Sequence, residues 1–157
     1  MTFTGSPLSS TQYALQVGAK AEVADIHAPI RYAYGTWTAA AAGVGEVNMF
    51  KLPAGRIRFF PDLSWLIIGD TGQATCNLSI GHRAYVNEDG TAVAEDFDEW
   101  ALNLDVGGSA LDQDVDSIVT SPTLMNSQDG IVVFVTFDTA DIDAASVMHL
   151  WFAYTHA

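Results

Sequence analysis

The segment VMHLWFAY, residues 147–154, alternates its side chains with a period of two. One set is Met148, Leu150, Phe152 and Tyr154, and the other is Val147, His149 and Trp151. Successive side chains of a β-strand point to opposite faces, so this spacing predicts a strand with one face turned inward. The residues are largely β-branched or aromatic, which strands prefer.

The same alternation recurs in YALQVGAKAEV (13–23), ATCNLSI (74–80) and IVVFVTF (131–137). Turn-forming residues separate these segments, at Pro53-Ala54-Gly55, Pro61-Asp62, Asp70-Thr71-Gly72 and Asp89-Gly90. We interpret the first of these turns as the tip of a β-hairpin. Many short strands with regularly spaced turns predict an all-β fold, an antiparallel β-sandwich or barrel.

One segment departs from this period. In AEDFDEWALNL, residues 94–104, apolar side chains fall at i, i+3, i+4 and i+7, and acidic residues crowd the first turn. This pattern predicts one short helix. Residues 1–12 are small and polar and are expected to form a flexible N-terminal arm, with a single β-sandwich domain over 13–157. Residues 105–129 lack a strand pattern and are expected to form a long loop.

The chain is acidic, with 6 Lys and Arg against 19 Asp and Glu and a formal net charge of −13. Direct binding to nucleic acid or to an acidic membrane surface is therefore not expected. No signal peptide or membrane span is expected either. Charged residues make up only 16% of the chain. Either part of the surface is buried against another chain, or Thr, Ser and Asn cover the outside of a β-rich domain.

The sequence offers little for chemistry, and we expect no enzyme activity and no cofactor. Cys76 lies within an apolar alternation and is predicted to be buried. The four histidines do not have the spacing of a metal site. Adjacent acids at 95–99 are explained by the predicted helix start. The weak calcium candidates are Asp112, Asp114 and Asp116, but this loop lacks the turn glycine and the final bidentate glutamate of a calcium loop.

Positive charge is concentrated in KLPAGRIRFF, residues 51–60, which holds Lys51, Arg56 and Arg58. If this segment alternates, Arg56, Arg58 and Phe60 share an outward face while Ile57 and Phe59 point to the core. Such a face has the composition of a protein-docking patch. The alternative is that the arginines pair with the protein's own acidic loops. Trp151, on the second face of its strand, is a further interface candidate.

Residues 35–85 as a whole resemble the small capsid decoration, or cement, proteins of tailed, particularly marine, bacteriophages. The shared pattern is a strand, an LPAGRI turn (52–57), a second strand, and an alternating segment that ends in LSIG (78–81). The resemblance implies a jelly-roll-like β-sandwich that is often trimeric. It also implies a place on the outside of an icosahedral head, where the protein would clamp capsid subunits.

The leading hypothesis is therefore a virion structural protein made in the host cytoplasm. Its partners would be the major capsid protein and copies of itself in a homotrimer. A tail, neck or receptor-binding sandwich remains an alternative within the same class. A carbohydrate-binding module, with Trp37 or Trp151 as its platform and an acidic loop holding calcium, is an alternative from a different class. An enzyme is the weakest interpretation.

Overall fold

The computed structural model describes residues 29–39, 45–72, 75–107, 111–114, 124–138, 142–143 and 145–156. Its strands are β1 (Arg31–Thr38), β2 (Glu46–Leu52), β3 (Gly55–Phe59), β4 (Trp65–Ile68), β5 (Asn77–His82), β6 (Tyr85–Val86), β7 (Ala92–Val93), β8 (Asp96–Asp105), β9 (Leu111–Asp114), β10 (Leu124–Ser127), β11 (Ile131–Asp138) and β12 (Val147–His156). A short 3₁₀ turn, η1, spans Pro61–Leu63. Within the described ranges, no helix is long and apolar enough to cross a membrane.

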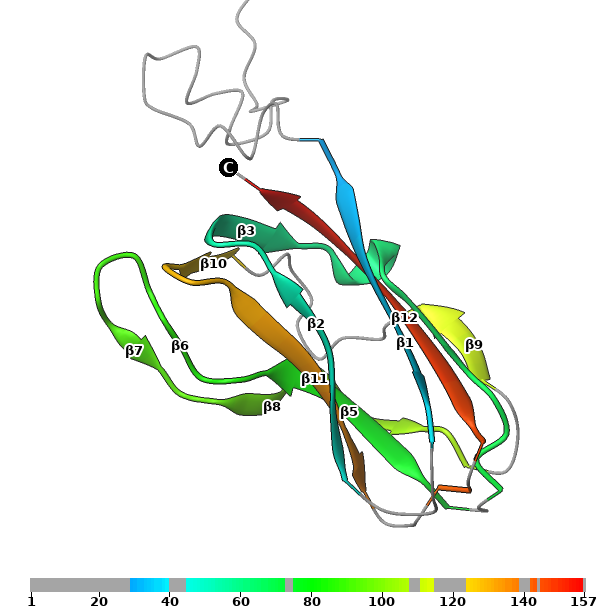
Figure 1. The fold of residues 1–157 in the computed structure, drawn as a ribbon. Helices are drawn as coiled ribbons and strands as arrows, with labels where there is room; N and C mark the ends of the chain where they lie inside the picture. The colour runs from blue at the N-terminus through cyan, green and yellow to red at the C-terminus, as the bar shows by residue number, and fades with distance from the viewer. Residues whose placement is uncertain are drawn as a thin grey trace, which may run out of the picture.

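Two antiparallel sheets pack face to face (Figure 1). In the first, β12 is central: β1 pairs along one side, while β4 and β3 follow one another along the other side and pair onward with β9 and β10. The second sheet has the order β2-β11-β5-β8. A small β6–β7 hairpin extends from the end of β5.

This order is that of a jelly roll. If β3 and β4 count as one strand interrupted by η1, and β9 and β10, which pair with them, count as a second interrupted strand, the chain from β1 to β5 changes sheet at every step. The chain from β8 to β12 then does the same. Four strands then stand in each sheet in the order of two interleaved Greek keys. The predicted antiparallel, jelly-roll-like β-sandwich is confirmed.

The core between the sheets is aromatic at its centre. Phe59 of β3 stacks on Phe152 of β12 with ring centroids 3.9 Å apart, and Trp100 of β8 meets the Phe152 ring edge-on at 4.8 Å. Trp100, Phe59 and Phe152 are among the largest fully buried side chains. Because these rings come from both sheets, their packing holds the two layers together.

The alternation found in the sequence is confirmed where the structure describes it. The predicted inward residues of β5, β11 and β12 are buried, and so is Cys76. Burial raises the pKa of the Cys76 thiol, and the nearby Asp105 and Asp138 carboxylates raise it further. This thiol is therefore a packed side chain rather than an activated nucleophile. The predicted arm 1–12, and with it the start of the domain at residue 13, lie outside the described residues.

The predicted helix at 94–104 is wrong, because this segment forms strand β8 (Asp96–Asp105) against β5. Its register against β5 shifts twice, once between Leu78 and Ile80 and once between Ile80 and His82. Such β-bulges insert extra residues into one strand, so the inward side chains no longer recur every second position. Trp100, Ala101 and Leu104 are buried at a spacing that resembles a helix face, whereas Phe97 is exposed.

Two other expectations need correction. Pro53-Ala54-Gly55 is not a hairpin tip, because β2 pairs with β11 in one sheet and β3 pairs with β10 and β12 in the other. The turn carries the chain across the sandwich, with Gly55 at a φ of 108° that favours glycine. The expected loop 105–129 contains the short strands β9 and β10, which extend the first sheet.

Candidate interaction surface

An aromatic row crosses the outer side of the first sheet. Tyr34 on β1 pairs in register with Trp151 on β12, and Trp151 pairs with Trp65 on β4. Directly paired residues project to the same side of a sheet. We call Tyr32, Tyr34, Trp65, His149 and Trp151 the aromatic face. Tyr32 is 58% exposed, Tyr34 49% and Trp65 42%, which is unusual for rings of this size.

Contacts within the face fix its rings. The Tyr34 hydroxyl and His149 Nδ1 are hydrogen-bonded at 2.7 Å, and the two ring planes differ by only 10°. Trp151 packs against both, with ring centroids 4.9 Å from Tyr34 and 5.7 Å from His149. These three side chains therefore hold one another in place before anything binds, which lowers the entropy that they lose on binding.

Of this face, sequence reasoning had named only Trp151 as a candidate. The signal for Tyr32 and Tyr34 was present in RYAYGTWT (31–38), where both tyrosines fall on the same side of an alternating segment. Trp37, the other platform considered for a carbohydrate module, is not on this face. Its ring packs inward on Phe137, with centroids 5.6 Å apart.

The predicted basic patch lies at one end of the sandwich, around the 53–55 turn. Lys51 is exposed at the end of β2, Arg56 is exposed on β3, and Arg58 is half-buried. Ile57 and Phe59 are buried, as predicted. Arg31 begins β1 at the same end, opposite Tyr154. We call Arg31, Lys51, Arg56 and Arg58 the basic end.

Four of the five Lys and Arg residues in the described ranges belong to this basic end. Arg56 and Arg58 both take part in interactions within the chain, so the internal-pairing interpretation stands beside docking. Phe60 is half-buried next to η1. Its backbone N–H donates to the Ala153 carbonyl at 3.0 Å, and the Ala153 N–H donates to Ser64 Oγ at 2.9 Å. These two hydrogen bonds hold the segment 60–64, which contains η1, against β12.

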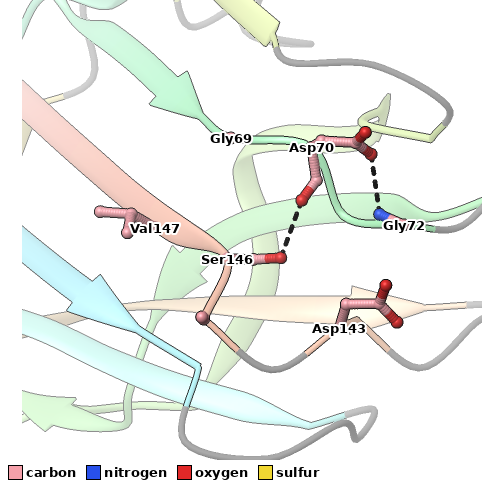
Figure 2. A pocket seen from close by; sticks show the side chains of 7 residues that line it. Gly69, Asp70, Gly72, Asp143, Ser146 and Val147 are labelled. Atoms are coloured by element: carbon pink, nitrogen blue, oxygen red, sulfur yellow. Dashed lines mark hydrogen bonds between the residues drawn. The ribbon is translucent and has the colours of Figure 1, made fainter.

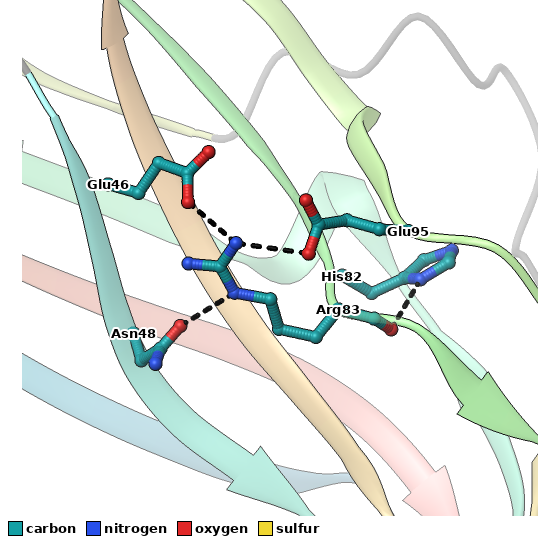
Figure 3. A network of polar contacts seen from close by, with 5 residues as sticks. All are labelled: Glu46, Asn48, His82, Arg83 and Glu95. Carbon is teal, nitrogen blue, oxygen red and sulfur yellow. Dashed lines mark hydrogen bonds and ion pairs between the residues drawn. The ribbon is translucent and has the colours of Figure 1, made fainter.

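The fifth cation, Arg83, is held on the second sheet (Figure 3). Its Nη1 contacts Glu46 Oε2 at 2.6 Å and Glu95 Oε2 at 3.0 Å, and its Nε donates to Asn48 Oδ1 at 3.0 Å. The guanidinium also lies over the Phe134 ring, 3.8 Å from its centroid. These partners hold Arg83 in a structural network between β2, β11 and the segment before β8.

Carboxylates gather on β8. Hydrogen bonding to Asp98 lowers the pKa of Asp96, and the same pairing raises the pKa of Asp98. Burial raises the pKa of Glu99, and the Asp96 and Asp98 charges add to this effect. These carboxylates give β8 an acidic surface.

An open hollow lies at the end of the sandwich opposite the basic end (Figure 2). Ser146 Oγ donates to the Asp70 carbonyl at 2.9 Å, and the Gly72 N–H donates to Asp70 Oδ1 at 2.8 Å. Asp143 lines the same hollow. These bonds are explained by the turn itself, and two carboxylates are fewer than a protein calcium site normally uses.

Two of the three calcium candidates fall on described residues, as backbone positions of one short strand. Asp112 and Asp114 stand on β9, opposite Ile67 and Trp65 of β4, and Asp116 lies outside the described residues. Across the part of the chain that the structure describes, no three His, Cys, Asp or Glu side chains gather closely enough to hold a metal ion.

Comparisons with known proteins bear on the fold. No protein-family model and no curated protein matches the sequence. Among solved structures, a chain of the cyanophage Pam1 capsid asymmetric unit matches with a TM-score of 0.54 and 11% identity, over 84% of this chain and 88% of that one.

A chain of the acidic stable capsid structure of Helicobacter pylori bacteriophage KHP30 matches with a TM-score of 0.42 and 16% identity, over 83% and 90% of the two chains. A chain of infectious bursal disease virus, Gx strain, matches with a TM-score of 0.45 and 14% identity, over 82% of this chain and 33% of that one. At 11% identity, the likeness to the Pam1 chain shows a shared fold and nothing more. The other two matches have TM-scores below 0.5 and do not strengthen that conclusion.

Proposed function

We propose that this chain is a virion structural protein, specifically a decoration or cement protein on the outside of an icosahedral phage head. The observation that carries the proposal is the fold shared with a chain of the Pam1 capsid asymmetric unit. Because 84% of this chain matches 88% of that one, the two chains are of similar length. The likeness therefore extends over most of both chains and is not limited to one domain of a larger capsid protein.

The charge distribution supports an oriented attachment. On a chain with a net charge of −13, positive charge is concentrated at the basic end, while Glu46, Glu95, Asp96 and Asp98 lie on the second sheet or beside it. Charge asymmetry of this kind orients a protein as it approaches a partner. In the proposal, the basic end meets the major capsid protein, copies of the chain assemble as a homotrimer, and no catalytic residue is needed.

Intact particles test the location. Antibody or gold labelling of purified virions should mark the whole head, whereas labelling confined to the tail or neck would replace this proposal with the tail or receptor-binding alternative. Particles that lack the protein should keep their shell geometry but break at lower temperature or after milder osmotic shock. Unchanged robustness would contradict the cementing role.

The basic end can be tested by substitution. Arg56→Glu combined with Arg58→Glu should abolish attachment to particles, and Arg56→Gln with Arg58→Gln should weaken it while preserving the fold. The control is Thr38→Glu at the exposed last residue of β1, which adds negative charge at the end of β1 opposite Arg31. Folded Glu variants that still decorate particles would favour internal pairing of the arginines.

A further inference from the structure

The aromatic face has a role that the basic end does not explain. Arg58 pairs with Thr155 of β12 and the aromatic row crosses β12 at Trp151, so the basic end and the aromatic face occupy different positions along the same outer side of the first sheet. Exposed rings that are locked to one another are costly to keep in water, and they usually mark a binding surface.

The arrangement of the rings favours an extended ligand. Tyr34, Trp151 and Trp65 stand on three adjacent strands in direct register. Adjacent strands lie about 4.8 Å apart, so the row offers one ring per strand at the scale of successive residues in a sugar chain. The Tyr34–His149 hydrogen bond holds the first part of this row in place.

The charge on and around the face disfavours an anionic ligand. Its five residues include no Asp, Glu, Lys or Arg, although the chain as a whole carries a net charge of −13. Long-range repulsion disfavours anionic chains such as nucleic acids, acidic lipids or uronic glycans. Asp112 and Asp114 of β9 stand in register opposite Ile67 and Trp65, so acidic positions border the face on that side and add to this repulsion.

The polar groups of the face favour a sugar over an apolar protein segment. The Tyr34 hydroxyl is already paired with His149 Nδ1, but the Tyr32 hydroxyl and the second ring nitrogen of His149 would each need a partner if an apolar segment buried them. A hexopyranose presents C–H groups on its faces and hydroxyls around its edge, so it can stack on the rings and pair with these polar groups at the same time.

We infer that the aromatic face binds a neutral polysaccharide of extended hexopyranose chains, with Tyr34, Trp151 and Trp65 stacking on successive sugar rings. This goes beyond the proposed capsid role and does not depend on it. On a virion, such a site would hold the particle to a neutral glycan at the surface of a cell.

The test uses the isolated protein and the neutral probes cellohexaose, chitohexaose and maltohexaose. Isothermal titration should detect saturable binding of at least one of the extended β-linked probes without added calcium, with a change in tryptophan fluorescence. Trp151→Ala and Trp65→Ala should each weaken binding about ten-fold, the effect of losing about 1.4 kcal/mol of ring stacking. Tyr34→Phe, which keeps the ring and loses the bond to His149, should have a smaller effect.

The matched control is Phe97→Ala, which removes an exposed aromatic ring from β8 in the other sheet and should leave binding unchanged. Melting temperatures identify any variant that has lost its fold, and Tyr34→Phe remains informative if a tryptophan variant unfolds. Absence of binding to all three probes and to a neutral glycan array overturns the inference, as does an equal loss in Phe97→Ala. If Trp65→Ala instead detaches the protein from particles without affecting sugar binding, the face is a protein-docking surface and the inference is wrong.

Discussion

Gly81, the last residue of the LSIG segment, gives the sharpest test of the fold. Strand β8 passes so close to β5 here that a Cβ on Gly81 would lie 2.0 Å from the Asp96 carbonyl oxygen and 2.4 Å from the Phe97 carbonyl carbon. Ordinary contact begins near 3.4 Å, so Gly81→Ala requires the β8 backbone to retreat by more than 1 Å. We expect the free energy of unfolding to fall by about 3 kcal/mol, the upper end for overpacking, because backbone cannot rotate away.

For a chain of this length, that loss corresponds to a melting temperature lower by about 6–12 °C, measurable by calorimetry or circular dichroism. Two controls separate crowding from backbone conformation. A Cβ on Gly45 would meet nothing within 4 Å, so Gly45→Ala should be neutral or slightly stabilising. Gly90 is equally open but has a φ of +86°, so Gly90→Ala should cost about 1–2 kcal/mol. If Gly81→Ala is no more destabilising than Gly90→Ala, the close approach of β5 and β8 is not the cause.

Three further predictions concern single side chains. Burial raises the pKa of Glu99 in the folded protein, so stability from this group is present at low pH and is lost as the pH rises through that pKa. Glu99→Gln should therefore raise the melting temperature at neutral pH and make no difference well below pH of about 4; equal melting curves at neutral pH would contradict this. Cys76 is buried with a raised pKa, and a thiol-specific dye should label it only after unfolding; fast labelling of the native protein would show that the strand opens. Arg83→Met should lower the free energy of unfolding by about 1 kcal/mol, and high salt should reduce the difference, since the ion pairs with Glu46 and Glu95 are partly exposed; a salt-independent loss would assign the effect to the Phe134 contact.

The strands that were predicted correctly are those whose signal is local. In IVVFVTF, residues 131–137, the odd-numbered side chains face the core, because successive side chains of a strand point to opposite faces. The segment 94–104 failed because its inward spacing is set by bulges against β5, and bulges depend on a partner strand distant in sequence. The 53–55 turn failed for a related reason. Its residues predict a turn, but whether the next strand returns to the same sheet or crosses to the other depends on the whole topology.

The two candidate surfaces also differ in whether a local sequence signal predicts them. The basic end could be predicted because Lys51, Arg56 and Arg58 are close in the chain, so their proximity in space needs only one turn. Tyr34 and Trp151 are more than one hundred residues apart, and the register of β1 against β12 alone makes them neighbours. No local pattern encodes that register. A jelly roll nevertheless builds such a surface easily, because its central strand β12, the last in the chain, pairs with the first described strand β1. In this protein the last strand supplies Trp151 and His149, the first described strand supplies Tyr34, and neither segment presents a binding surface alone.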